Sequence, residues 1–414
     1  MHCLLTALGS YGDVHPMIGL GVALARRRYR VEVVSNPHFE PLIRGAGLGF
    51  LAVSSAEAYD TLTQRRDLWK PLSGMRVVFQ YGVIDLLQEL YEVVASAYRP
   101  GETVIAAHGL DLASRVAAES LGAPVASIVY APMALWSDRS PPRMPFGFTR
   151  PAWLARQQFR LVERMLRSHP VQRALDSLRE RVGLGPLRQR YFDWYYGVAP
   201  PVCLFPEWFA ADPGDWPART TLTGFPLWDG ANAPHLPAEV EAFLAAGDPP
   251  LAFTPGSANR VAERFFSAAV GACQRLGRRG VLLTKYPEQL PAQLPDTVRW
   301  VGFQPLSQVL PRCDAFVHHG GIGSCAQGLA AGIVQLIQPL GFDQFDNAER
   351  LRRLGVGDEL KPARFTASRV ADKLRRLLDD PQAASRAQEI ALSIDSEQAL
   401  TRACEALIAL HASR

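Results

Sequence analysis

The stretch "DAFVHHGGIGSCAQGLAAGIVQLIQ", residues 314–338, contains the pattern that decides the fold. Short apolar and β-branched runs begin and end it, and a glycine-rich loop and a helical run of small residues lie between them. This order predicts a strand, a loop, a helix and a second strand parallel to the first. In such a unit the loop lies at the carboxyl end of the first strand, where ligands bind.

The same alternation of strands and helices extends along the rest of the chain. Strands are predicted at 2–8, 30–35, 102–108, 123–130, 201–206, 250–254, 280–284, 314–318 and 334–338. The first helix is expected from about Pro16 to Arg28, because proline commonly marks the first turn of a helix. The fold class is therefore expected to be α/β, with two doubly wound, Rossmann-like domains.

A segment dense in Gly, Pro and Asn separates the two series of strands. We therefore expect a first domain at 1–225, a linker at 226–240 and a second domain at 241–414. The C-terminal helix of the second domain is a candidate to return to the first.

Composition and charge are those of a globular protein. The 414 residues are 48% hydrophobic and 20% charged, with a net charge of +4, which does not indicate nucleic acid as a partner. The six cysteines lie far apart without a CxxC pair, which disfavours a zinc site or disulfide framework and favours a reducing cytoplasm. No run of about 18 apolar residues predicts a membrane span, and the first residues resemble a strand rather than a secretory signal.

Three loops with chemistry suited to a phosphorylated sugar are expected at one edge of the second sheet. The loop from His318 to Gly323 leads into a helix whose free N–H groups and dipole favour an anion. "FTPGSAN" (253–259) places glycine and serine after a neighbouring strand, and "LGFDQFDNAER" (340–350) brings Asp343 and Gln344, which suit sugar hydroxyls. The convergence of these loops favours a ligand site over a simple tight turn.

Long segments of the chain resemble a known family. "GFQPLSQVLPRCDAFVHHGGIGSCAQGLAAGIVQLIQPLGFDQFDNAERL" (302–351) closely resembles the donor-binding signature of GT-B nucleotide-sugar glycosyltransferases, the UDP-glycosyltransferase superfamily, and "GSYGDVHPMIGLGVAL" (9–24) resembles their acceptor side. The resemblance implies two Rossmann-like domains that face each other across a cleft. "CLFPEWFAADPGDWP" (203–217) and "GFPLWDG" (224–230) resemble, more narrowly, the bacterial rhamnosyltransferases of rhamnolipid assembly.

The resemblance implies roles for residues of the donor site. His319 falls on the diphosphate, although the adjacent His318 leaves open which histidine meets it. Phe303 stands where many relatives have a tryptophan on the nucleobase, and Gln327 where many have a glutamate on the ribose, so the choice between UDP and dTDP stays open. The full predicted donor-binding set is Gly256, Ser257, Phe303, His318, His319, Gly321, Gly323, Ser324, Gln327, Asp343 and Gln344.

A base is needed to take the proton of the acceptor hydroxyl during an inverting transfer. Asp13, in the loop after the first strand, is the candidate, because the "GDVxP" form of this loop resembles branches of the family that use an aspartate there. His15 is the alternative base. Asp13 also has the features of a helix N-cap, and His108, at the end of its strand, is either a packed histidine or a group that orients acceptor or base.

The sequence therefore predicts an inverting, metal-independent glycosyltransferase without a cofactor, whose co-substrate is a dTDP- or UDP-linked sugar. The favoured reaction moves rhamnose from dTDP-rhamnose to a hydroxyl of a hydrophobic or lipid acceptor. The alternatives are a UDP-glucose-dependent transferase acting on a polyketide, terpenoid or other small lipophile, and a catalytically silent helper subunit. The enzyme is expected in the cytoplasm, where the arginine-rich region 150–196 is a candidate for peripheral contact with the inner membrane face.

Overall fold

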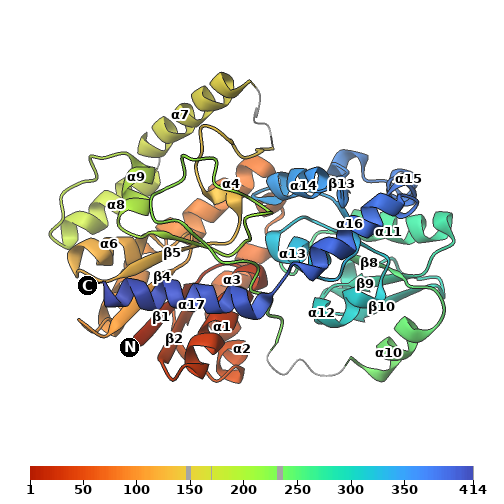
Figure 1. Cartoon of the computed structure of the whole chain (residues 1–414), viewed down its shortest axis with the longest axis horizontal. Helices are drawn as coiled ribbons and strands as arrows, with labels where there is room; N and C mark the ends of the chain where they lie inside the picture. The colour runs from red at the N-terminus through yellow and green to blue at the C-terminus, as the bar shows by residue number, and fades with distance from the viewer. Residues whose placement is uncertain (146–150, 169, 231–235, 414) are drawn as a thin grey trace. The chain divides into compact units, whose positions relative to one another are not determined.

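The computed structural model describes residues 1–414 apart from 146–150, 169, 231–235 and 414. The chain divides into two compact units (Figure 1). Unit 1 comprises Met1–Leu68, Leu72–Trp228 and Asp395–Arg414, and unit 2 comprises Trp69–Pro71 and Asp229–Ile394. Of the linker expected at 226–240, residues 231–235 lie outside the described part of the chain.

Unit 1 is built on a parallel sheet of seven strands in the order β3-β2-β1-β4-β5-β6-β7. The strands are β1 His2–Ala7, β2 Arg30–Ser35, β3 Gly49–Ala52, β4 Thr103–Ala107, β5 Val125–Val129, β6 Pro201–Cys203 and β7 Thr221–Leu222. Every residue of β1, β4 and β5 is buried, because helices cover both faces of a doubly wound parallel sheet.

Helices follow most of these strands. They are α1 Tyr11–Arg26, α2 Glu40–Gly45, α3 Ala56–Thr63, α4 Pro71–Phe79, α5 Leu87–Ala97, α6 Leu112–Ser120, α7 Ala152–Ser168, α8 Pro170–Arg181, α9 Tyr191–Gly197 and the C-terminal α17 Ser396–Ala412. Although α17 is the last element of the chain, its Ala403, Cys404 and Leu407 are buried in the core of unit 1 together with Leu5 and Leu20. Unit 1 is therefore completed by the C-terminal helix.

Unit 2 is built on a parallel sheet of six strands in the order β10-β9-β8-β11-β12-β13. The strands are β8 Leu251–Thr254, β9 Gly280–Leu283, β10 Val298–Gly302, β11 Ala315–His318, β12 Val334–Ile337 and β13 Gly357–Glu359. The helices are α10 Ala238–Ala245, α11 Glu263–Leu276, α12 Leu306–Val309, α13 Ile322–Ala330, α14 Gln344–Arg353, α15 Ala367–Leu378 and α16 Pro381–Leu392. The predicted fold class, two parallel α/β sheets with helices, is confirmed.

The first helix begins earlier than the sequence predicted. α1 starts at Tyr11 rather than near Pro16, and its N-cap is Ser10, whose hydroxyl accepts the Gly12 N–H at 3.3 Å. The prediction was wrong because it took the proline as the start of the helix, whereas the capping pair of Ser10 and Asp13 satisfies the first N–H groups one turn earlier.

No helix in the described part of the chain combines the length and the apolar character needed to cross a bilayer.

Candidate active site

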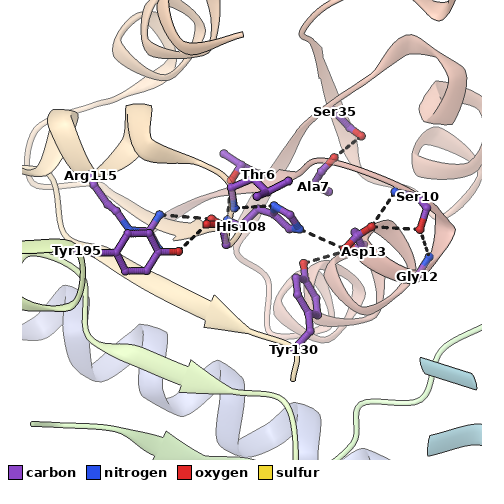
Figure 2. Close-up of polar contacts among 12 residues, drawn as sticks. Thr6, Ala7, Ser10, Gly12, Asp13, Ser35, His108, Arg115, Tyr130 and Tyr195 are labelled. Carbon is purple, nitrogen blue, oxygen red and sulfur yellow. Dashed lines mark hydrogen bonds and ion pairs between the residues drawn. The ribbon is translucent and has the colours of Figure 1, made fainter. Parts of the chain in front are cut away.

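Three neighbouring strands of unit 1 bring polar groups to the carboxyl edge of their sheet (Figure 2). β1 leads through a short loop to Asp13, the third residue of α1. His108 directly follows β4, and Tyr130 directly follows β5. Because β1, β4 and β5 are adjacent and parallel, these three residues meet although they are far apart in the chain.

The carboxylate of Asp13 is held from two sides. Its Oδ2 accepts hydrogen bonds from the Ser10 N–H at 2.7 Å and from the Ser10 hydroxyl at 3.1 Å, and its Oδ1 lies 3.3 Å from Nε2 of His108 (Figure 2). The Tyr130 hydroxyl donates to the Asp13 carbonyl at 3.0 Å. The Asp13 side chain remains 34% exposed, so a substrate hydroxyl can reach a carboxylate whose orientation is set.

The hydrogen bond at Nδ1 of His108 indicates which tautomer the neutral ring adopts. The Leu110 N–H donates to Nδ1 at 3.1 Å, so Nδ1 is an acceptor and the proton of the neutral ring lies on Nε2. Nε2 therefore donates to Asp13 from a ring that is only 5% exposed. The sequence left open whether His108 packs or orients acceptor or base; in the structure its ring is buried and contacts Asp13, the candidate base.

A buried network holds His108 in place. The Thr6 hydroxyl accepts the His108 N–H at 2.9 Å and donates to Asp111 at 2.7 Å. The fully buried Arg115 donates to the His108 carbonyl at 3.3 Å, and its guanidinium lies 3.6 Å from the ring centroid of Tyr195 (Figure 2). A buried charge that is hydrogen-bonded on several sides cannot shift without large cost, so the position of His108 is rigid.

Gly9 is required by the position of Asp13. Its φ of +116° lies in the left-handed region, and a Cβ built there would lie 2.4 Å from Oδ2 of Asp13. Both the backbone conformation and the space therefore demand glycine. His15, the alternative base, packs edge-on against Tyr11 at 5.4 Å and against Trp228 at 5.3 Å between ring centroids.

At the carboxyl edge of the unit 2 sheet, the three neighbouring strands β8, β11 and β12 end in register. His318, the last residue of β11, pairs with Thr254 of β8 on one side and with Ile337 of β12 on the other. The loops that follow these three residues contain Gly256, His319 and Asp343 and begin at the same height. The three loops that the sequence predicted to converge therefore leave the sheet at one edge.

The ring of His319 lies between two glycines. A Cβ at Gly256 would lie 2.9 Å from its Cε1, and a Cβ at Gly321 would lie 2.6 Å from its Nε2. Gly256 also has a φ of +100°, which an L-residue adopts only with strain. Any side chain at either position would displace the ring, so the two glycines define where His319 stands.

His319 is neutral and has one hydrogen to donate. Burial lowers its pKa to about 4, so it carries no charge near neutral pH. Its Nδ1 is buried and has no hydrogen-bond partner among the residues that the structure describes. Because a buried N–H without an acceptor is more costly than a lone pair without a donor, the proton is favoured on Nε2. The ring thus offers Nε2–H as a donor beside the start of α13.

His318 differs from its neighbour in its hydrogen bonds. The ring is fully buried, its Nε2 lies 2.9 Å from Oε1 of Gln335, and its Nδ1 accepts the Gly320 N–H at 3.1 Å. Burial, followed by the proximity of His319, lowers its pKa to about 3. Both nitrogens of His318 are engaged inside unit 2, and it is a neutral histidine of the core.

The N-terminus of α13 has no side-chain cap of its own. Gly321 occupies the N-cap position, and around the Cβ position of Gly323 there is no atom within 4 Å. The Ile322 N–H is accepted by Oδ2 of Asp343 at 3.2 Å. The next N–H groups, including that of the partly exposed Ser324, point along the helix axis toward a position where an anion would be stabilised.

Four of the predicted donor residues are placed as follows. Asp343 also accepts a hydrogen bond from the Asn347 amide at 2.7 Å. Gln344 is buried, and its Oε1 accepts the N–H groups of Leu340 and Gly341 at 2.7 and 3.1 Å. Gln327 is buried on α13. The side-chain oxygen of Gln344 therefore shapes the loop after β12, and Ser257 follows Gly256 in a partly exposed loop.

Phe303 directly follows β10, and its ring is 43% exposed. The Lys285 ammonium lies 4.5 Å from the centroid of this ring. Burial, followed by the charge of Arg260, lowers the pKa of Lys285 to about 8. The sequence analysis did not include Lys285 in the predicted donor-binding set, although this residue directly follows the predicted strand at 280–284. Within the described residues, no three His, Cys, Asp or Glu side chains form a group that could hold a metal.

Comparisons with known proteins found similar chains. The family described as "Erythromycin biosynthesis protein CIII-like, C-terminal domain" matches residues 281–410. The O-mycaminosyltylonolide 6-deoxyallosyltransferase of Streptomyces fradiae is 29% identical over 98% of this chain and 96% of its own length.

Solved structures match along the whole chain. The glycosyltransferase VinC in complex with DTDP has a TM-score of 0.71 at 23% identity and covers 100% of both chains. The spinosyn rhamnosyltransferase SpnG complexed with thymidine diphosphate has a TM-score of 0.66 at 22% identity, with 98% of this chain and 100% of that chain covered. The fold is that of GT-B glycosyltransferases, and the similar proteins confirm the predicted class of enzyme, a glycosyltransferase.

Proposed function

We propose that this chain transfers a 6-deoxyhexose, with rhamnose as the first choice, from a dTDP-linked donor to a hydroxyl of a hydrophobic, polyketide-type acceptor. The names of the similar proteins support each part: a 6-deoxyallosyltransferase of O-mycaminosyltylonolide, an erythromycin biosynthesis family, and structures that contain DTDP or thymidine diphosphate. The narrower resemblance to rhamnolipid enzymes predicts a hydroxy-fatty-acid lipid as the acceptor. We include this lipid in the assay as the alternative acceptor.

The ring of His319 carries this proposal. It is neutral, its position is defined by Gly256 and Gly321, and its Nε2–H lies beside the start of α13, whose N-cap is a glycine. A departing nucleoside diphosphate gains negative charge in the transition state. A fixed N–H donor and a helix N-terminus stabilise that charge more than they stabilise the ground state, which is the condition for catalysis.

Asp13 supplies the other half of the reaction. The acceptor hydroxyl gives its proton to the Asp13 carboxylate while its oxygen forms a bond to the anomeric carbon. The bond from that carbon to the diphosphate breaks on the opposite face and leaves both electrons on the phosphate oxygen, so the configuration inverts. His108, donating through Nε2, is a positioning residue that orients Asp13.

The order of strands in unit 2 suggests a path for the nucleotide. With the diphosphate beside β11 and the base on the exposed ring of Phe303 after β10, the donor would pass over the ends of β8 and β9. Lys285 follows β9 and lies over that ring, so its ammonium is placed to meet the diphosphate or the base. As the sequence predicted, we assign Asp343 and Gln344 to the hydroxyl groups of the sugar.

We further propose that the transfer needs no divalent metal. Two groups of unit 2 can do what a cation would do for the leaving diphosphate: the positive end of α13 and the Nε2–H of His319. Activity that is unchanged in excess chelator would support this part, and loss of activity restored by Mg²⁺ would contradict it.

The test combines binding and turnover on the full chain. Calorimetry with dTDP and UDP measures nucleotide preference, and mass spectrometry follows transfer from dTDP-rhamnose and UDP-glucose to a macrolide aglycone and to a hydroxy-fatty acid. We expect tighter binding of dTDP and transfer from dTDP-rhamnose to the macrolide. Transfer from UDP-glucose alone would replace the donor assignment, and nucleotide binding without turnover on any acceptor would indicate a helper subunit.

A further inference from the structure

Three large apolar side chains are exposed on a single helix of unit 1. Trp153, Leu161 and Met165 of α7 are 64%, 55% and 60% exposed. Figure 1 shows α7 at the outer edge of unit 1. On the neighbouring α8, by contrast, the apolar residues Val171 and Leu175 are buried. Trp153, Leu161 and Met165 thus lie on the surface rather than in the core.

These three residues belong to one side of the helix. At 3.6 residues per turn, Leu161 and Met165 lie about 80° and about 120° around the axis from Trp153. Together with the exposed Gln157, which lies midway between Trp153 and Leu161, they form a mostly apolar strip along the helix. Exposed large apolar residues gathered in this way are characteristic of an interaction surface, whereas single ones are ordinary.

A row of exposed arginines lies beside the apolar strip. Arg156, Arg160 and Arg164 follow one another at intervals of four residues, and all three are exposed. Residues four apart lie on the same side of a helix, so the three guanidinium groups form a basic edge along the strip. An apolar strip with a basic edge is the arrangement of helices that lie in the interface of an anionic bilayer.

We propose that the exposed side of α7 is a docking surface for an anionic lipid bilayer. Trp153, Leu161 and Met165 enter the boundary between headgroups and acyl chains, where apolar surface leaves water. Arg156, Arg160 and Arg164 lie level with the phosphates, with which guanidinium groups form charge-assisted hydrogen bonds. The arginine row favours an anionic bilayer over a purely apolar partner. A purely apolar partner would bury the three guanidinium groups without an anion to pair with them.

The test is sedimentation of the full chain with vesicles. We expect binding to phosphatidylcholine vesicles that contain a third of phosphatidylglycerol, little binding to pure phosphatidylcholine, and loss of binding at high salt. The substitution R156Q/R160Q/R164Q should weaken binding roughly a hundredfold. The substitution W153S/L161S/M165S should weaken it at least tenfold. Melting temperatures should stay close to that of the parent protein, since all six side chains are exposed.

Matched control variants distinguish vesicle binding through α7 from non-specific binding through other exposed apolar or basic side chains. Leu392 at the end of α16 is 90% exposed, and Arg369, Arg375 and Arg376 are exposed on α15. The variants L392S and R369Q/R375Q/R376Q should bind vesicles like the parent. Equal loss in test and control variants, or no binding of the parent, would overturn the proposal.

Two other occupants of the strip would be recognised by different results. A second copy of the chain would give a concentration-dependent dimer, without vesicles, that W153S/L161S/M165S abolishes. A hydrophobic acceptor covered by α7 would give a raised KM for that acceptor in the same variant. Either result, without vesicle binding by the parent, would overturn the membrane assignment.

Discussion

Two junctions between a strand and a helix, one in each unit, share a design and differ in how the helix begins. The β1–α1 junction and the β11–α13 junction both use a left-handed glycine, Gly9 and Gly320, to turn the chain at the carboxyl edge of a sheet. The N-terminus of α1 is capped locally, because Ser10 and Asp13 form a capping box in which each side chain accepts a backbone N–H of the first turn. α13 has Gly321 as its N-cap, which offers no side chain, and its first N–H, that of Ile322, is accepted by Asp343 from the loop after β12.

The difference explains what each junction can bind. At α1 the positive end of the helix already faces the Asp13 carboxylate, so an anionic ligand would meet a like charge there. At α13 the Asp343 carboxylate accepts the Ile322 N–H at 3.2 Å, and the N–H groups that follow it, together with the neutral His319, remain for an anion. Two junctions of the same backbone type are therefore suited to opposite tasks, acceptance of a proton in unit 1 and stabilisation of a leaving anion in unit 2.

The largest effect is expected at the carboxylate of the first junction. Asp13→Asn removes the proton acceptor but keeps an oxygen for the Ser10 N–H, so turnover should fall roughly 100- to 10,000-fold while dTDP affinity and melting temperature change little. Steady-state kinetics at saturating donor measures the effect. Ser10→Ala, which removes a cap and leaves the carboxylate, is the control and should keep most of the activity. His15→Asn tests the alternative base, and a comparable loss there would move the assignment.

At the second junction, His319→Ala should lower turnover roughly 100- to 1,000-fold, the scale for one lost donor to a developing anion. The neighbouring His318 provides the contrast. Because its two nitrogens are bonded within the core, His318→Ala should lower the melting temperature, with any loss of activity following the loss of folded protein. Kinetics and thermal denaturation are measured on both variants. A folded, inactive His318→Ala together with an active His319→Ala would reverse the roles of the two histidines.

A matched pair of glycine substitutions separates the two junctions. Gly9→Ala should displace the Asp13 carboxylate and lower turnover about tenfold or more without weakening dTDP binding, and Gly256→Ala should displace His319 and weaken dTDP binding. Each also strains the backbone by about 1–2 kcal/mol. Gly183→Ala and Gly247→Ala are the controls, because both glycines have positive φ and no atom within 4 Å of the added Cβ. If the controls impair activity equally, strain rather than displacement is the cause.

The smallest effect is expected from Lys285 and depends on pH. With its pKa lowered to about 8, Lys285 is a cation below that pH and loses its charge as the pH rises. Affinity for dTDP should therefore be highest below pH 8 and fall up to about tenfold between pH 7.5 and 9.5, a range above the titration of the phosphate itself. Lys285→Met should bind more weakly at pH 7.5 and show a flat profile in calorimetry. A parallel fall in this variant would remove Lys285 from the donor site.

The strands that the sequence did not predict lie at the edges of the sheets. β3 and β7 are the two edges of the first sheet, and β10 and β13 are the two edges of the second. None of the four is buried throughout, whereas the central strands β1, β4 and β11 are. Central strands of a parallel sheet appear as continuous apolar runs, while a short edge strand is covered on fewer sides and lacks such a run.

The sequence by itself determined the βαβ alternation, the two series of strands and the glycine-rich loop at 318–323, because period, turn residues and loop composition are local properties. Only the tertiary structure decided which side chains meet at each loop and which of them are available to a ligand. It brought His108 to Asp13 across two strands, engaged His318 in the core and left His319 between Gly256 and Gly321. These relations depend on strand order and burial, which join residues a hundred positions apart and are not encoded in any short segment.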